Sequence, residues 1–345
     1  MSADDRTGAL EVAAEIAATA GVVRVGVGGR VGDSFADAGG VVDLGSRHLA
    51  PHEAIERILS LPDVGWTAHK FDSTLRGNWA HELRARHERT GRRVLVVAGW
   101  PAMGRTCVDG VVQVHGVPVG AIADELPEAE LLADVVELRR WLEGDSRFAA
   151  VDVLDEASMH ATARAVAGTS VLVGGPAGPV GAAFAAHSAA RSGRPRVQTV
   201  EHCHLPALVV CGSATDLSRE QVRRLQAVNQ SVDTLEAPHT EGDLVPEVAL
   251  ELAGRARARL ALTTYRTLVL IGGETAAAVL GDGVRVVGGT VAAGMPWSRD
   301  ALGEGPLVVT KAGGFGGPDA LVRLFADTTF TDTTFADTTL TDETG

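Results

Sequence analysis

The chain has 345 residues, 45% of them hydrophobic and 22% charged, which is enough apolar material for the cores of two globular domains of about 100–200 residues each. Its formal net charge of −13 argues against a protein that binds a nucleic-acid backbone, because such proteins need clustered Lys and Arg. A small anionic substrate remains compatible with this charge, since a local basic site can oppose the global balance.

Runs rich in Val and Leu alternate with helical patterns along the chain. We expect strands at Val22–Val27, Val64–Phe71, Val94–Ala98, Val171–Val173, Leu208–Cys211, Leu268–Ile271 and Leu307–Thr310, and a hairpin through Val111–Val114 and Val117. We expect helices at Ala9–Ala20, His52–Ser60, His81–Thr90, Glu128–Leu142, Met159–Ala167, Ala182–Arg191, Ser218–Ala227 and Pro246–Leu262. Apolar strands that alternate with helices predict an α/β fold with mainly parallel sheets covered on both faces.

Composition changes at Pro195–Pro206, which separates a helix from a fresh strand–helix unit. We therefore predict an N-terminal domain at residues 1–195 and a C-terminal domain at residues 196–325. Residues 326–345 repeat a short unit of Thr and Asp that has no core-forming period. Such a segment predicts a disordered tail.

The cysteines are few and suggest no special chemistry. Cys107, Cys203 and Cys211 have no disulfide-framework spacing, which favours a reducing cytoplasm. The triplet His202-Cys203-His204 lacks a second ligand pair at metal spacing, so we predict no metal site there. No stretch is apolar enough to span a bilayer and the N-terminus lacks a signal, so we expect a cytoplasmic protein without a membrane partner.

Polar clusters follow four of the predicted strands. They are FDSTLRGN, GSATDLS, GGETAAA and KAGGFGG. In parallel sheets ligands bind at the carboxyl ends of the strands, so four such clusters indicate a ligand site rather than ordinary turns.

Acidic and basic residues near the N-terminus are candidates for binding a polar anion. Asp4 and Asp5 precede an amphipathic helix, where they could act only as N-capping residues or could bind a ligand. Arg47 offers a planar fork that suits a carboxylate, although an isolated arginine is more often a surface residue. Arg105 lies in a later loop, GRTCVDG, whose polar residues can be explained as ordering the loop itself.

The FDSTLRGN cluster carries the densest polarity. Asp72 could take or orient a hydroxyl proton, and Ser73 and Thr74 could bind substrate hydroxyls. Arg76 could hold a carboxylate, and Lys70 could do the same or pair with Asp72. Gly77, which follows Arg76, would let a ligand approach the backbone closely. The alternative is a capped turn with an internal salt bridge.

Glycine-rich turns in the C-terminal half indicate a nucleotide triphosphate. Free backbone N–H groups at the helix starts after Ser213 and Gly272 favour an anion, and Lys311 adds a positive charge. Neither G-x-x-x-x-G-K-[ST] nor a G-x-G-x-x-G after a first strand occurs, so this is neither an ordinary P-loop nor a plain dinucleotide fold.

Together, ADDRTGALE (Ala3–Glu11), KFDSTLRGN, PAMGRTCVDG, GGETAAAVL and KAGGFGGPD resemble the four-carbon acid sugar kinases, in the family's order and across most of residues 3–325. The resemblance implies two Rossmann-like domains, one for the acid sugar and one for the nucleotide, with the active site in the cleft between them. It implies an ATP-dependent kinase, a phosphotransferase of carbohydrate metabolism, that acts on the terminal hydroxyl of a tetronate such as threonate, erythronate or 3-oxo-tetronate. Mg²⁺ is expected, bridging phosphate oxygens with few protein ligands.

The resemblance and the chemistry of the residues together give candidates for each role. The catalytic candidates are Asp5, Asp72 and Arg76. The candidates for binding the acid sugar are Asp4, Asp5, Arg47, Lys70, Asp72, Ser73, Thr74, Leu75 and Arg76. The candidates for binding ATP are Ser213, Gly272, Gly273, Glu274, Thr275, Lys311, Gly313 and Gly314.

The chain departs from the family pattern at its start. Only Met1 and Ser2 precede the ADD motif where the family has an apolar strand, so either the start codon is misplaced or the first strand is missing, and without that strand Asp4 and Asp5 would lack its support. A second hypothesis is therefore a degenerate member that binds acid sugar or nucleotide without turnover. A third, a nicotinamide-dependent oxidoreductase, lacks its G-x-G-x-x-G motif. A homodimer is the candidate assembly, because symmetric dimers are the commonest oligomers.

Overall fold

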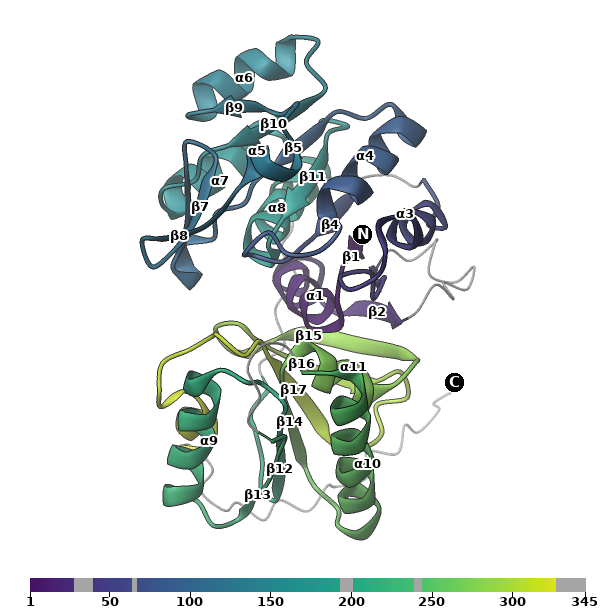
Figure 1. The fold of residues 1–345 in the computed structure, drawn as a ribbon, viewed down its shortest axis with the longest axis vertical. Helices are drawn as coiled ribbons and strands as arrows, with labels where there is room; N and C mark the ends of the chain where they lie inside the picture. The colour runs from purple at the N-terminus through teal and green to yellow at the C-terminus, as the bar shows by residue number, and fades with distance from the viewer. Residues whose placement is uncertain (28–39, 64–66, 193–200, 239–243, 327–345) are drawn as a thin grey trace, which may run out of the picture.

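The computed structural model describes residues 1–27, 40–63, 67–192, 201–238 and 244–326. It is an α/β protein with a large, mostly parallel sheet flanked by helices (Figure 1). The predicted domain junction falls largely on residues 193–200 and the predicted tail on residues 327–345, and both of these segments lie outside the described residues.

The strands are β1 (Ser2–Ala3), β2 (Val23–Val27), β3 (Val41–Asp43), β4 (Ala68–Lys70), β5 (Val94–Val96), β6 (Arg105–Val108), β7 (Val111–Val114), β8 (Val117–Ala121), β9 (Glu130–Leu132), β10 (Phe148–Val151), β11 (Leu172–Gly175), β12 (Ala207–Cys211), β13 (Val232–Glu236), β14 (Thr267–Ile271), β15 (Val284–Ala292), β16 (Met295–Asp300) and β17 (Leu307–Lys311). The helices are α1 (Arg6–Ala20), α3 (Pro51–Leu59), α4 (Trp79–Thr90), the 3₁₀ helix η1 (Pro101–Met103), α5 (Ile122–Glu125), α6 (Val135–Glu143), α7 (Glu156–Ala165), α8 (Ala177–Ser192), α9 (Asp216–Val228), α10 (Pro246–Leu262), α11 (Gly273–Leu280) and α12 (Ala320–Leu324).

One sheet runs through both halves of the molecule. The N-terminal half contributes parallel strands in the order β2-β3-β1-β4-β11-β5-β10-β9, and the C-terminal half contributes β13-β12-β14-β17-β16-β15. Strands β15 and β16 are antiparallel to their neighbours, and β15 pairs with β2 in register Val287↔Val23. This pairing joins the described strands into a continuous sheet of fourteen.

The described residues include a short first strand before Asp4. Ser2–Ala3 forms β1 between β3 and β4, with Ser2 opposite both Val42 and His69. The backbone N–H of Asp4 then donates to the Lys70 carbonyl at 3.1 Å. Two residues are enough here because β1 pairs in parallel with a strand on each side. Asp4 and Asp5 therefore directly follow a strand in the interior of the sheet, which fixes their backbone position.

The predicted helix at Glu128–Leu142 is wrong in its first part. Residues Glu130–Leu132 form β9, which pairs with β10, and α6 begins only at Val135. The side chain of Asp134 caps that helix by accepting from the backbone N–H groups of Val136 and Glu137. The predicted hairpin is confirmed and is extended by β6 into a separate antiparallel sheet, β6-β7-β8.

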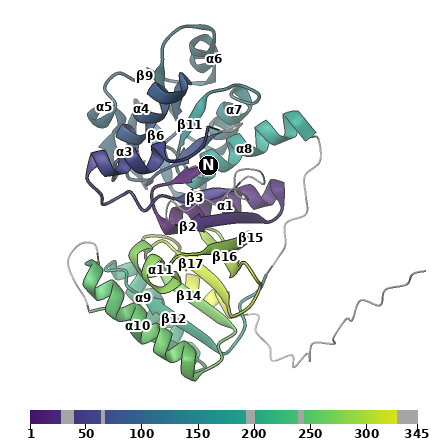
Figure 2. The ribbon, with the colours of Figure 1, turned by 90° about the vertical axis from the view of Figure 1, so that its right-hand side faces the viewer.

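Helix α1 contacts elements of both halves. It packs on α8 of the N-terminal half and on β15 and α11 of the C-terminal half, and both views of the ribbon show it at the level where the halves meet (Figures 1 and 2). A Cβ added at Gly181 of α8 would lie 2.4 Å from the Cβ of Glu15, so α1 and α8 approach too closely for a larger residue. The Ala-rich sequence of α1 permits this packing.

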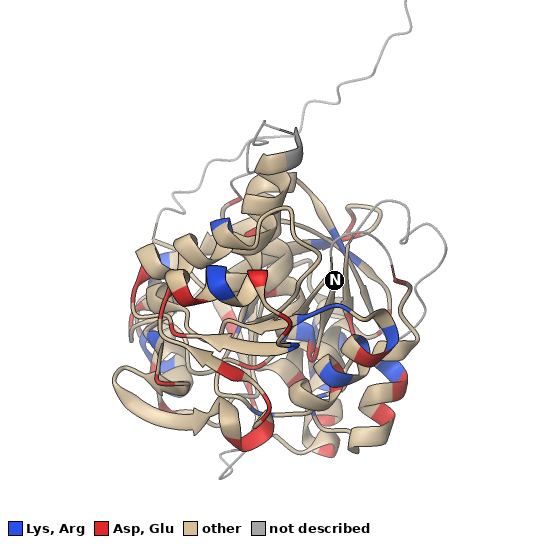
Figure 3. Ribbon diagram, turned by 90° about the horizontal axis from the view of Figure 1, so that it is seen from above, with Lys and Arg blue, Asp and Glu red and all other residues tan. Residues whose placement is uncertain are grey.

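None of the described helices combines the length and the apolar character that a membrane span requires. Figure 3, seen from above, shows acidic and basic residues interspersed along the ribbon.

Candidate active site

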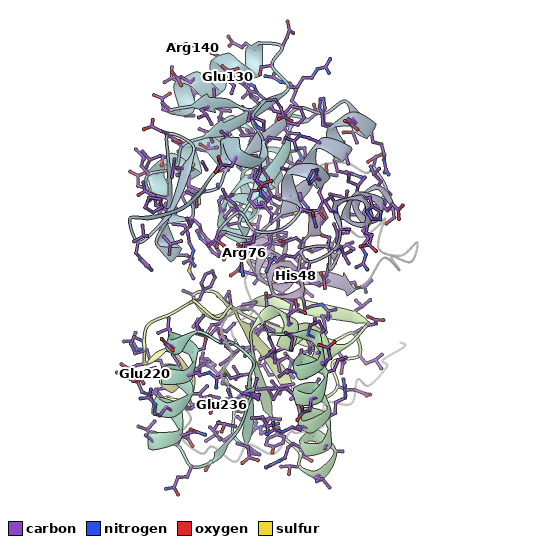
Figure 4. The ribbon with its side chains drawn as sticks, viewed as in Figure 1. His48, Arg76, Glu130, Arg140, Glu220 and Glu236 are labelled. Carbon is purple, nitrogen blue, oxygen red and sulfur yellow. The ribbon has the colours of Figure 1, made fainter. Side chains whose placement is uncertain are left out.

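A cavity of about 640 Å³ is lined by residues from both halves. It lies at the carboxyl ends of β1, β3 and β4 on one side and of β12, β14 and β17 on the other. The lining includes most of the residues that the sequence singled out: Asp5, Arg47, Lys70, Asp72, Ser73, Thr74, Arg76, Ser213, Gly272, Gly273, Glu274, Thr275, Gly313 and Gly314. Figure 4 labels Arg76 and His48 at the level where the halves meet, far from Glu130 and Arg140 at one end and from Glu220 in the other half.

Asp5 is both a helix cap and a wall of the cavity. As the N-cap of α1 its Oδ1 accepts from the Gly8 N–H at 2.9 Å, and its Oδ2 accepts from the Thr7 hydroxyl at 2.7 Å. A Cβ at Gly8 would lie 2.0 Å from the Lys70 Nζ, so the glycine leaves the space that the lysine occupies. The Thr-Gly pair of the ADDRTG motif thus orients one carboxylate and admits one ammonium.

Asp5 stays ionised although it is buried. Burial opposes its charge, but Arg47 Nη2 at 2.9 Å and Lys70 Nζ at 3.4 Å outweigh that cost and hold the pKa of Asp5 well below its usual range. Lys70 is charged for the reciprocal reason: burial disfavours its ammonium, but Asp5 and Asp4 raise its pKa above the ordinary value.

Arg47 is held between three carboxylates. Its Nε and Nη2 donate to the two oxygens of Asp4 at 2.9 and 3.0 Å, and its Nη1 lies 3.6 Å from Asp72. Asp4 is 1% exposed and does not line the cavity; it anchors the arginine from behind. The planar fork expected to bind a substrate carboxylate is therefore already filled by Asp4.

The FDSTLRGN loop is a turn with an internal salt bridge, the alternative considered for it above, and it also lines the cavity. Asp72 accepts from the Thr74 N–H at 2.8 Å and from Arg76 Nη2 at 2.8 Å. Burial opposes the charge of Asp72, but Arg76 and Arg47 outweigh it and lower its pKa below the usual range. Leu75 does not line the cavity, because its side chain packs beside Gly120 against the core.

The end of the same motif supports Arg47. Gly77 has φ +91°, and a Cβ there would lie 3.1 Å from Arg47 Cγ. The Asn78 amide donates to the carbonyls of Ser46 and Leu49 at 2.9 and 3.0 Å. The close approach that the sequence suggested for this glycine is thus to a neighbouring loop.

The start of α11 faces the acidic wall. A Cβ at Gly273 would lie 2.9 Å from Asp5 Oδ2 and 3.4 Å from the Thr7 hydroxyl oxygen. The hydroxyl of Thr275 is buried in the same turn and has no hydrogen-bond partner among the described residues. An unpaired hydroxyl beside the free N–H groups of a helix start suits an anionic ligand.

Two further turns complete the C-terminal wall. The Ser213 hydroxyl lies 3.0 Å from that of Thr215, and the Ser218 hydroxyl donates to the Gly313 carbonyl at 2.7 Å. Lys311 does not line the cavity: its Nζ donates to the carbonyls of Ala312 and Gly313 at 3.0 and 3.1 Å. Burial lowers its pKa to about 8. Lys311 thus fixes the glycine turn from behind.

The sequence analysis did not select several lining residues. They include Thr7, Glu11, His48, Arg105, Thr215 and Phe315. The spacing of Thr7 and Glu11, one helical turn apart and following Asp5, could have placed both on the cavity face of α1. The sequence marks Arg105 only as a polar loop residue and gives no sign of its contact with Phe315, because that contact joins segments about 200 residues apart in the chain.

Glu11 is half-buried in the wall between Lys70 and Arg105. Burial raises the pKa of Glu11 to about 8, with Asp5 and Glu15 adding to the rise and Lys70 opposing it. Its side chain is therefore mostly protonated at neutral pH, unlike Asp5 and Asp72.

Comparison with known proteins gives one family match and two curated relatives. Residues 1–124 match the family described as a sugar-binding N-terminal domain. The chain is 29% identical to a D-threonate kinase of Bordetella bronchiseptica, covering 93% of this chain and 95% of the relative, and 28% identical to a D-threonate kinase of Cupriavidus necator, covering 81% and 85%.

Solved structures share the fold. One from Salmonella typhimurium LT2 superimposes with a TM-score of 0.71 at 19% identity, covering 95% of this chain and 98% of that one. A Haemophilus influenzae protein described by the DUF1537 family does so with a TM-score of 0.62 at 20% identity, covering 94% and 99%.

Proposed function

We propose that this chain, which is similar to D-threonate kinases over most of its length, is a four-carbon acid sugar kinase that transfers the γ-phosphoryl group of ATP to the terminal hydroxyl of a tetronate such as threonate, erythronate or 3-oxo-tetronate. The observation that carries the proposal is the close approach of Asp5 to the start of α11, where a Cβ added at Gly273 would lie 2.9 Å from Asp5 Oδ2. It brings an oriented carboxylate and a phosphate-type cradle to the same point of one cavity.

The N-terminal wall provides what the reacting alcohol needs. Asp5 is ionised and held by Thr7, Gly8 and Arg47, so its free lone pairs can accept a hydrogen bond from a substrate hydroxyl in one fixed direction. The hydroxyls of Ser73 and Thr74 in the same wall can bind the remaining alcohol groups of a tetronate.

The C-terminal wall provides what a nucleotide needs. The N–H groups at the start of α11 and the unpaired Thr275 hydroxyl would hold the terminal phosphates, with the Gly313–Gly314 turn on the other side. In this proposal residues 1–195 form the sugar domain and residues 196–325 the nucleotide domain.

Mg²⁺ would enter as part of MgATP. Among the described residues no group of three or more His, Cys, Asp or Glu side chains is arranged to hold a metal by itself. Glu274 lines the cavity, and its side chain is 40% exposed. We propose that its carboxylate contacts the phosphate-bound ion. The ion would neutralise charge on the phosphates.

Positioning accounts for the proposed chemistry. The hydroxyl oxygen forms a bond to the γ-phosphorus while the bond from that phosphorus to the bridging oxygen breaks, and ADP departs with the electron pair. The hydroxyl proton leaves through its hydrogen bond to Asp5. Because the pKa of Asp5 is low, its main contribution is to aim the oxygen, which is sufficient where the transition state is loose.

The test is ADP release from MgATP across a panel of tetronates and pentonates. We expect turnover with a four-carbon acid and slower or no turnover with five-carbon acids. Thermal stabilisation by ATP without ADP release from any acid would replace this proposal with a binding protein that does not turn over. Stabilisation by NAD but not by ATP would replace it with an oxidoreductase.

A further inference from the structure

We propose that Arg105 binds the carboxylate of the acid-sugar substrate, an assignment that rests on the proposed function. Arg105 is the first residue of β6, an edge strand of the small antiparallel sheet. It lines the cavity and is only 6% exposed. Sequence reasoning gave the carboxylate to Arg47 or Arg76 instead.

The other cations of the cavity are already paired. Arg47 and Lys70 are each within 4 Å of Asp4 and Asp5, and Arg76 is bonded to Asp72. Within the described part of the chain Arg105 forms no direct ion pair: the carboxyl groups of Glu11 and Asp72 act on it electrostatically, but Asp72 is bonded to Arg76. A buried guanidinium without a counterion is costly unless a ligand supplies the anion.

The guanidinium of Arg105 is nevertheless fixed in place. Its Nη1 donates to the Met103 carbonyl, its Nε lies 3.4 Å from the Ser73 hydroxyl, and its Cζ lies 4.3 Å above the centre of the Phe315 ring. These neutral contacts orient the planar group, and none of them supplies a carboxylate in direct contact with it. A carboxylate is the anion whose geometry matches that fork.

Glu11 does not supply the missing anion. Its pKa of about 8 leaves it mostly protonated at neutral pH, so it can exchange hydrogen bonds with an alcohol rather than neutralise Arg105. Glu11 interacts electrostatically with Asp5, Lys70 and Arg105, and all four residues line the same cavity. A substrate whose terminal hydroxyl meets Asp5 would therefore run past Glu11 and present its acid end to Arg105.

The discriminating experiment measures binding without ATP. Calorimetric titration compares a tetronate with its neutral tetronamide on the wild type, Arg105→Gln and Arg105→Lys, with Arg76→Gln as the rival and Arg140→Gln as the remote control. Arg140 is exposed and lies at the far end of the N-terminal half (Figure 4). Unfolding temperatures of all variants establish that each one is folded.

We expect Arg105→Gln to weaken tetronate binding by about 10- to 100-fold, the effect of losing a charge-assisted hydrogen-bond pair, and to change tetronamide binding by less than about 3-fold. Arg105→Lys should fall between the wild type and Arg105→Gln, and Arg140→Gln should match the wild type. Equal losses for acid and amide, or a selective loss only in Arg76→Gln, would overturn the assignment, as would a wild type that binds no tetronate.

The same titration separates this inference from the proposed function. If the wild type binds tetronate and the Arg105 variants show the selective loss, but MgATP gives no ADP release, the kinase proposal fails and the carboxylate site stands. If turnover is normal but the selective loss is absent, the kinase proposal stands and Arg105 has another role, such as contacting the phosphates.

Discussion

Single residues of this protein combine structural and chemical roles. Asp5 caps α1 and faces the cavity, Gly8 makes room for Lys70, and Lys70 keeps Asp5 charged. From the sequence, Asp5 could either cap a helix or bind a ligand. In the structure it caps α1, and the capping hydrogen bonds hold its carboxylate in the cavity wall. Substitutions that preserve the cap can therefore separate chemistry from stability.

Asp5→Asn is the cleanest such substitution. Asn is as good an N-cap as Asp, so α1 should remain intact, whereas loss of the charge that aims the substrate hydroxyl should lower kcat by about 10²-fold. Steady-state kinetics and an unfolding temperature check this together. Asp134→Asn, the same change at the N-cap of α6, should leave kcat unchanged; an Asp5→Asn variant with near-normal kcat would contradict the role given to Asp5.

Glu11 should make stability depend on pH. Its pKa is about 8 in the folded protein and ordinary in the unfolded chain, so the folded state holds the proton between the two values and stability falls as pH rises from about 4.5 to 8. In Glu11→Gln this loss, of order 1–3 kcal/mol, should disappear. Urea unfolding at pH 5, 7 and 9 measures it, with exposed Glu143→Gln as the control; equal pH slopes in wild type and Glu11→Gln would refute the assignment.

Gly273→Ala should block the nucleotide. The new methyl would lie 2.9 Å from Asp5 Oδ2, inside the space proposed for phosphate, although the backbone itself tolerates alanine. ATP should then no longer raise the unfolding temperature. Gly254→Ala, where a Cβ meets nothing within 4 Å, should keep full protection by ATP. Protection retained in Gly273→Ala would place the nucleotide elsewhere.

Elements predicted from the sequence were right where the local pattern is strong. The buried Val- and Leu-rich strands and the amphipathic helices lie close to their expected positions, because burial on both faces leaves a clear apolar signature. Strands β15 and β16 were missed, since VRVVGGTVA and MPWSRD are broken by glycine and proline and pair antiparallel across a bulge. The two residues of β1 carry no pattern, and only their neighbours in the sheet make them a strand.

A buried polar network explains part of what the pattern could not. The Ser2 hydroxyl lies 3.0 Å from His69 Nδ1, and His69 Nε2 lies 3.0 Å from Glu82, all of them nearly inaccessible. This network ties β1 and β4 to α4 beneath the cavity. It accounts for a histidine and a glutamate in positions that a sequence pattern assigns to apolar residues.

The contact between α1 and α8 can be tested as an element. Gly181→Val would push the Cβ to within 2.4 Å of Glu15 and should destabilise the protein by about 1–3 kcal/mol through overpacking, beyond the helix-propensity cost. Gly254→Val in α10 carries the same propensity cost with nothing within 4 Å. Urea unfolding of the two variants should differ; identical midpoints would mean that the helices can separate without cost.

At the scale of the whole molecule, the cavity depends on contacts between the halves. Arg6 of α1 donates to the Gly281 carbonyl at 2.9 Å, His48 lies 3.4 Å from Glu274, and Arg105 stacks on Phe315. The sequence predicted that polar clusters would gather at strand ends, and they do. It could not predict that Arg47 forms ion pairs with three carboxylates while Arg105 forms no direct ion pair among the described residues, because both facts depend on residues brought together only by the fold.

The central claim is that the hydroxyl aimed by Asp5 meets the phosphate held at Gly273 within one cavity. Phosphorus NMR of the product formed from MgATP and the best tetronate tests it most directly, since it shows which carbon carries the new phosphate. The account predicts a single phosphomonoester on the terminal carbon. Inorganic phosphate alone, or an ester on another carbon, would contradict it.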